Sequence, residues 1–187
     1  MVKQQQEIQN INIQLLGSSQ QSLQYLTLKY CDDRLNQQNS LNCQFIEYIN
    51  THICVVYFWN DFGFDNIEDK NLKLRFQNVH GVIFMYDINN YQHFVEISQR
   101  FFRVQRVEQL LNKKFSKILI GIQQNESEQR QVSKKEAQEF SDSTGAKIYE
   151  LFQFQQNNFD ESLDYLIEEI LRINQIEYKQ QNHNKQL

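Results

Sequence analysis

Two near-continuous apolar runs, at residues 79–86 and 118–122, constrain the fold of this chain more than any other feature. A strand that faces solvent on one side alternates apolar and polar residues, whereas a strand covered on both faces is apolar throughout. Strands of the second kind occur in parallel sheets that carry helices on both faces, because the crossover connections place helices there. The two runs therefore predict an α/β protein built around a parallel sheet.

Weaker patterns extend this sheet in both directions. An apolar strand at residues 11–16 ends at Gly17, and the β-rich runs 45–49 and 53–59 are separated only by a short polar break, which is typical of a hairpin. Residues 147–152 form a weaker strand. We expect six strands, mostly parallel, with one antiparallel hairpin.

Helical segments are expected between the strands, at residues 23–30, 91–113, 133–144 and 158–177. Ser133 and Glu136 have the spacing of a capping box, in which each side chain accepts a hydrogen bond from the other residue's backbone N–H, and Gly145 stands where a helix commonly ends. The predicted order is β-α-ββ-α-β-α-β-α-β-α, with helices on both faces of the sheet, and its second helix, between the hairpin and the strand at residues 79–86, is not assigned to particular residues.

A chain of 187 residues suffices for one domain, which we place at residues 8–177 between polar tails at 1–7 and 178–187. The 19 Lys and Arg against 23 Asp and Glu give a formal net charge of -4, which argues against nucleic acid or an anionic membrane as a partner. No apolar stretch approaches the ~20 residues that cross a bilayer, and the N-terminus does not resemble a signal peptide. We expect a cytoplasmic protein.

Neither cysteine nor histidine spacing indicates a metal site. Cys31, Cys43 and Cys54 are odd in number and lack C-x-x-C spacing, so buried thiols are expected. The four histidines have no mutual ligand spacing. We therefore expect no bound metal.

Several stretches, taken in order, resemble Rab small GTPases. Residues 78–88, Asn-Val-His-Gly-Val-Ile-Phe-Met-Tyr-Asp-Ile, look like the fourth strand of that family. Residues 118–121 and 131–137 look like its next strand and helix, and residues 160–163 resemble the start of its last helix. The resemblance covers about residues 8–175 and implies a Ras-like G domain.

The loop after the first strand departs from the family's pattern. Where the family has G-x-x-x-x-G-K-[ST], whose backbone, Lys and hydroxyl hold phosphates and Mg²⁺, residues 17–24 keep only Gly17. Leu23 replaces the Lys, and Gln24 replaces the magnesium ligand. Ser19 and Ser22 are conceivable substitute ligands, although hydroxyls in a turn more often bond the local backbone.

The other loops depart in the same way. In the family's D-T-A-G-Q-E, Asn60 stands for the Asp and Phe64 for the Gln that orients water, while Gly63 remains. Ser40 lies near the family's Thr in the first switch region. In N-K-x-D, the neutral Asn125 replaces the Asp that selects guanine.

Two aromatic residues align with the family's S-A-K loop. Phe152 and Phe154 would fill a base pocket rather than line it, or they are ordinary packing residues. Together with the lost loop residues, they lead us to expect no nucleotide cofactor.

We therefore expect a catalytically inactive relative of small GTPases, not an enzyme, that acts as a structural or interaction subunit among other protein subunits. The alternatives are a divergent switch that still binds GTP or GDP, and an enzyme of another class, for which no cluster of ionisable residues is apparent. The sequence ends without a cysteine, so we expect no prenyl group that would anchor it directly to a membrane. Its amide bias, about a quarter Gln and Asn, suggests a cytoskeletal or ciliary assembly.

A partner surface is expected at the switch-like loops, residues 32–44 and 60–75, because a domain without nucleotide must order these segments by other contacts. The exposed apolar candidates are Leu35, Leu41, Phe62, Phe64 and Ile67. The alternative is that these side chains only close the vacant cleft.

Overall fold

The computed structural model describes residues 8–17, 42–49, 52–60, 64–123, 128–152 and 156–184. Its elements are β1 (Ile8–Gly17), β2 (Asn42–Ile49), β3 (His52–Asn60), the 3₁₀ turn η1 (Phe64–Asn66), α2 (Asp69–Phe76), β4 (Gly81–Asp87), α3 (Tyr91–Leu111), β5 (Ser116–Gln123), α4 (Lys134–Thr144), β6 (Lys147–Phe152) and α5 (Gln156–Asn184). The predicted helix at residues 23–30 lies outside the described residues.

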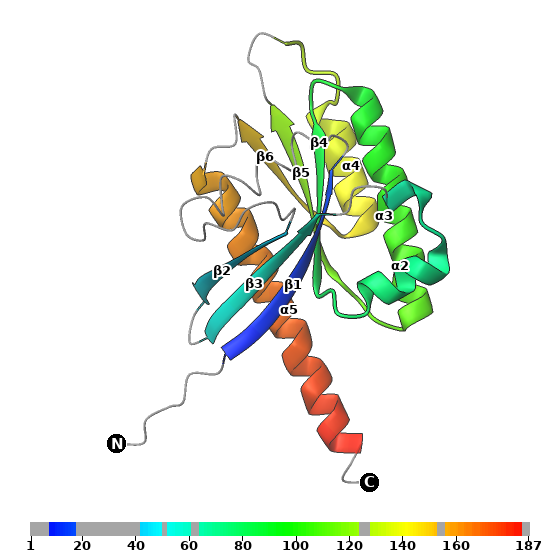
Figure 1. Ribbon diagram of the computed structural model, residues 1–187. Helices are drawn as coiled ribbons and strands as arrows, with labels where there is room; N and C mark the ends of the chain where they lie inside the picture. Colours follow the sequence, from blue (N-terminus) through cyan, green and yellow to red (C-terminus); the bar gives the residue numbers. More distant parts are fainter. Residues whose placement is uncertain are drawn as a thin grey trace.

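The six strands form one sheet in the order β2-β3-β1-β4-β5-β6 (Figure 1). Only the β2–β3 pair is antiparallel, and Ile49 faces His52 across its turn, whereas the other four pairs are parallel. This confirms the predicted mostly parallel sheet with one hairpin. The carboxyl ends of the parallel strands consequently meet at one edge, where α/β proteins place their sites.

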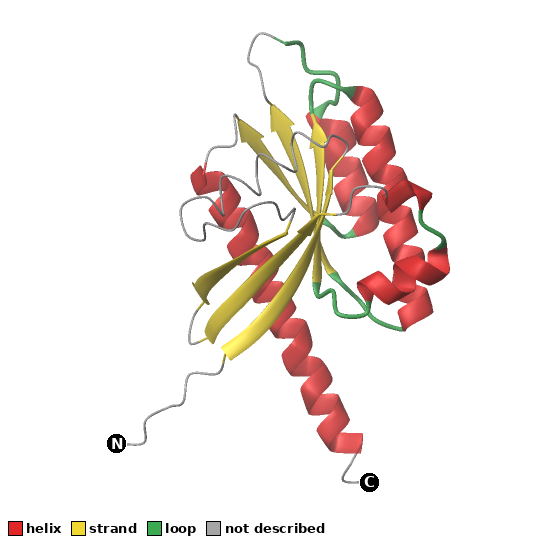
Figure 2. Cartoon of the chain, in the orientation of Figure 1, coloured by secondary structure: helices red, strands yellow, loops and turns green. Residues whose placement is uncertain are grey.

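Helices cover both faces of the sheet, as predicted (Figure 2). Helix α5 packs on one face, where Leu163 and Leu166 meet Ile13 and Phe58 in a first buried cluster. Helices α2, α3 and α4 lie on the other face, over a second cluster that is rich in phenylalanine. The side chains of β4 are buried from Val82 to Tyr86, which explains its unbroken apolar run.

The caps of α4 follow the sequence signals. Ser133 is the N-cap and forms the capping box with Glu136, and Gly145 ends the helix with a φ of 72°. The hydrogen bonds from the Ser133 hydroxyl and backbone N–H lower the pKa of the Glu136 carboxyl.

Two boundaries differ from the sequence prediction. Residues 60–75 are not a continuous loop, because they include the η1 turn and most of α2. Helix α5 runs to Asn184 rather than ending near Glu177, since no Gly or Pro interrupts it and the residues there form helices well enough. The division into a domain and two tails otherwise stays a prediction.

His80 joins β1 to β4 and β5 just before β4 begins. Its backbone N–H donates to the Asn12 carbonyl at 2.8 Å, its imidazole Nδ1 accepts from the Asn12 N–H at 3.0 Å, and its carbonyl accepts from the Ser116 N–H at 3.2 Å. Burial, assisted by the nearby Lys113 charge, lowers the pKa of His80 to about 4. The folded protein therefore needs the neutral imidazole.

Acid should weaken the fold through His80. In the unfolded chain the imidazole binds a proton near its ordinary pKa of 6.5, whereas in the folded protein its pKa is about 4. The contribution of His80 to the unfolding free energy is therefore complete above pH 6.5 and decreases as the pH falls toward 4. We expect His80→Asn, whose Oδ1 offers an acceptor without titrating, to show a smaller loss of unfolding free energy across this range. Urea denaturation at several pH values measures the unfolding free energy of both proteins. An equal dependence of this free energy on pH in the two proteins would contradict the prediction.

Candidate functional site

The candidate site lies at the carboxyl edge of the sheet, where β1 ends at Gly17 and β3 ends at Asn60. Leu15 pairs with Asn60, so the two strand ends are neighbours. Of the phosphate-loop, switch and base positions named from the sequence, Gly17, Asn60, Phe64 and Phe152 lie among the described residues. The others, Ser19, Ser22, Ser40, Gly63 and Asn125, lie outside them, as do Leu23, Gln24 and Phe154.

Arg100 of α3 connects two segments at this edge. Its Nε donates to both carboxylate oxygens of Asp65, at 3.0 and 3.1 Å, and its Nη1 donates to the carbonyl of Gly17. The Arg100 side chain is only 16% exposed, whereas that of Asp65 is 56% exposed. A guanidinium group suits this role because its planar fork donates in several fixed directions.

Phe64 is buried and does not face solvent. Its side chain is 1% exposed, and its ring centroid lies 6.1 Å from that of Phe76 in α2. The expectation that Phe64 is an exposed partner residue was wrong, because the ring fits into the apolar cluster between α2 and α3. Ile67 is partly buried against the same cluster, and the remaining candidates, Leu35, Leu41 and Phe62, lie outside the described residues.

Arg103, one helical turn after Arg100, holds the same segment. Its guanidinium carbon lies 5.1 Å from the Phe64 ring centroid, a cation–π distance. Its Nη1 donates to the Phe64 carbonyl and its Nη2 to the Ile67 carbonyl. Residues 64–67 are therefore fixed to α3 by two arginines and one buried ring.

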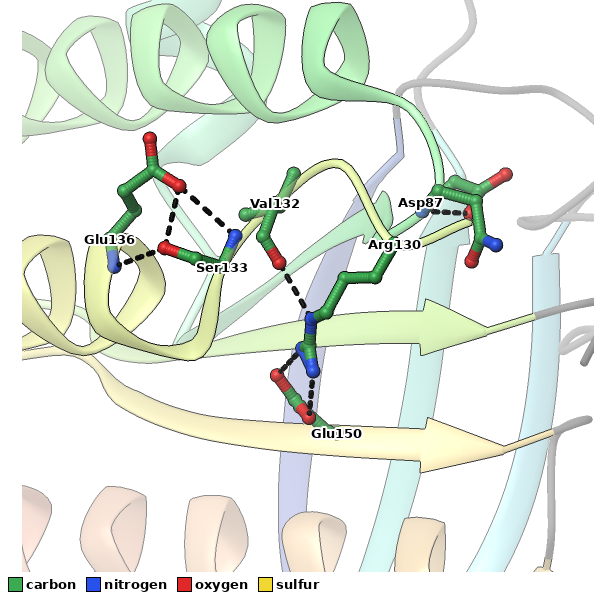
Figure 3. A network of polar contacts seen from close by, with 7 residues as sticks. Asp87, Arg130, Val132, Ser133, Glu136 and Glu150 are labelled. Atoms are coloured by element: carbon green, nitrogen blue, oxygen red, sulfur yellow. Dashed lines mark hydrogen bonds and ion pairs between the residues drawn. The ribbon is translucent and has the colours of Figure 1, made fainter. Parts of the chain in front are cut away.

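A second polar network lies at the ends of β4 and β6 (Figure 3). Arg130 donates through Nε to the Val132 carbonyl at 2.7 Å and pairs with the Glu150 carboxylate of β6. Nearby, the Asp87 carboxylate accepts from the Asn89 backbone N–H at 2.9 Å. Phe152, which the sequence suggested as a plug or packing residue, is the half-buried last residue of β6.

Sequence reasoning did not find these arginines. Arg100 and Arg103 have the i, i+3 spacing of residues on one helix face, but their partners lie between 35 and 83 residues earlier in the chain. Such spacing indicates that two side chains share one face of a helix, but it does not identify the residues that they contact. The aligned position of Phe64 was visible in the sequence, whereas its burial was not.

The part of the arrangement that the structure describes offers little chemistry of its own. The Phe64 ring has no polar atom with which to orient water, and the charge of Arg100 is opposed by Asp65. Within the described ranges, no three His, Cys, Asp or Glu side chains gather closely enough to hold a metal ion. No helix in the described part of the chain is both long and apolar enough to cross a membrane.

Comparison with known proteins agrees with this geometry. The family model described as the Ras family matches residues 12–172, from β1 into α5. No individual curated protein matches the chain.

Replacing Phe64 with the family's glutamine should destabilise the domain. Phe64→Gln places an amide without partners in the apolar cluster, so we expect a loss of about 2–5 kcal/mol in the unfolding free energy, measured by urea denaturation. Phe64→Leu, the matched control, keeps the site apolar and should cost less. A Phe64→Gln effect within about 0.5 kcal/mol, as at an exposed position, would contradict the burial.

Proposed function

Because the chain belongs to the Ras family, we propose that it is a small-GTPase-like protein that neither binds nor hydrolyses guanine nucleotide. It acts instead as a fixed structural or interaction subunit among other proteins. The observation that carries the proposal is the fixed segment 64–67, in which a buried Phe64 occupies the position of the water-orienting glutamine.

The loop sequences support a loss of affinity. A hydrogen bond to a charged group contributes roughly 1.5–3 kcal/mol of binding free energy. The loss of about five such contacts therefore removes on the order of 7–15 kcal/mol of nucleotide-binding free energy when their contributions are additive. Nanomolar to picomolar binding corresponds to about 12–16 kcal/mol. Leu23, Gln24 and Asn125, at the lysine, magnesium and guanine positions, account for the principal losses.

The contacts of α3 support a loss of switching. In GTPases, the γ-phosphate and Mg²⁺ order the switch segments, which are released on hydrolysis. In this chain, Arg100 and Arg103 order residues 64–67 by contacts that involve no ligand. A nucleotide could shift this segment only by binding two of its conformations with different affinity.

The second candidate is a divergent switch that still binds GTP or GDP. Gly17 favours it, because β1 still ends at the family's first loop glycine and the sheet that supports the site is complete. A cytoskeletal or ciliary setting also belongs to the proposal, and its support is the amide-rich composition alone.

Guanine nucleotides should leave the protein unchanged. We expect titration with fluorescent GTP and GDP analogues in excess Mg²⁺ to give dissociation constants weaker than about 10 μM, roughly 7 kcal/mol of binding. The melting temperature should stay constant, because a ligand stabilises only a native state that it binds.

A variant with Leu23→Lys, Gln24→Ser and Asn125→Asp is the matched comparison, since it restores three family residues. Any gain in affinity in this variant would assign the loss to these positions. Tighter binding than about 10 μM by the unaltered chain, or nucleotide extracted from natively purified protein, would favour the switch.

A further inference from the structure

Charge is unevenly divided between the segment that contains α3 and the first part of α5. Residues 70–117, which include most of α2 and all of α3, hold nine Lys and Arg against three Asp and Glu. Residues 156–171, the first part of α5, hold five Asp and Glu and no Lys or Arg. Because α3 and α5 cover opposite faces of the sheet (Figure 1), basic and acidic surfaces point away from each other.

The outer face of α3 also exposes large apolar side chains. Tyr91, Phe102 and Leu110 are 46%, 57% and 47% exposed, and their spacing places them in one row along the helix. Arg106 is exposed between the last two, and Lys114 is exposed just beyond the helix. An apolar row bordered by cations suits an acidic helical surface.

Helix α5 presents such a surface on its outer side. Glu161, Asp164 and Glu168 are exposed at successive turns, away from the buried Leu163 and Leu166. Partial burial, and then the charge of Glu168 one turn away, raise the pKa of the Asp164 carboxyl.

The row on α5 is not purely acidic. The half-buried Tyr165 ring lies within it, and the Lys147 ammonium of β6 lies 3.9 Å from the centroid of that ring. A hydrogen bond with Tyr149 is the largest cause that raises the pKa of Lys147, and the Glu161 carboxylate adds a smaller part, so this cation lies close enough to offset some of the negative charge. A docked helix would therefore meet an aromatic ring flanked by carboxylates.

We propose that the outer face of α3 docks on the acidic face of α5 of a second copy of this chain. Each molecule uses a different face for its two neighbours, so the contact is heterologous, and its repetition produces an open-ended row. A contact between single helices is small beside the roughly 1,200 Å² of a stable interface, so the association is weak and depends on salt. The inference rests on the proposed function insofar as the chain acts through a fixed surface.

Sedimentation velocity of the full chain without nucleotide tests the association. At about 0.05 M salt we expect species larger than the monomer that increase with concentration up to about 0.1 mM, and at about 0.5 M salt we expect monomer, since screening shortens the reach of the charges. A monomer under both conditions would overturn the proposal.

Two sets of variants test the geometry. Phe102→Glu with Leu110→Glu removes the α3 face, and Glu161→Lys with Glu168→Lys removes the α5 face; each protein alone should be monomeric. An equimolar mixture retains one intact face of each kind and should form a 1:1 dimer and nothing longer. Ile46→Glu, at an exposed apolar residue of β2, is the matched control and should assemble like the unaltered chain.

Leu110→Glu with Lys114→Glu replaces the first variant if the loss of Phe102 disturbs Phe140, whose ring centroid lies 6.2 Å away. A mixture that stays monomeric, or an α3 variant that still assembles, would overturn the proposal. So would binding of a glutamate-rich amphipathic peptide or of anionic vesicles to the α3 face of a protein that does not self-associate. Nucleotide binding in the separate titration would refute the proposed function and leave this result standing.

Discussion

The packing of α3 against the sheet is the contact on which the rest of the structure depends. Its inner residues, Phe94, Ile97 and Phe101, are buried against β4, and the Phe84 and Phe101 ring centroids lie 5.0 Å apart. Apolar burial of this kind is worth roughly 25 cal/mol per Å², summed along the roughly six turns of the 21-residue helix. Because this packing anchors the helix, the arginines on its flank start from defined positions and lose little further entropy when they bind.

The two arginines do not contribute equally. Asp65 is more than half exposed, so solvent screens its pairing with Arg100 and places that contact toward the lower end of the ~0–1 kcal/mol range of surface ion pairs. Arg103 binds carbonyl oxygens that are partly buried and also covers the Phe64 ring, where water competes less. Arg103 and the buried ring therefore hold residues 64–67 more strongly than the ion pair does.

Much of the fold could be predicted from the sequence, because its signals are local. The apolar run of β4 and the capping box of Ser133 each depend on neighbours in the chain, and both were confirmed. Helix α2 could not be placed, since only Leu72 and Phe76 mark its buried side. The direction of Phe64 was equally hidden, because an aromatic residue after a strand is compatible with solvent, a partner or a cluster formed by distant helices.

Helix α3 packs on the sheet through its inner side, holds residues 64–67 with its flank and exposes its outer side, and these three sides connect the fold to the proposed role. A switch needs a segment whose contacts are made and broken by its ligand, so that segment must be only marginally stable without it. In residues 64–67, a buried ring and carbonyl hydrogen bonds join the segment to a helix that is packed through its inner face, which supports the proposed loss of switching. Rigidity of this kind suits a surface that partners meet in one form, since no ordering entropy then opposes binding. The outer side of α3, where Phe102 stays exposed while its neighbour Phe101 is buried, is the surface that we propose for such a contact.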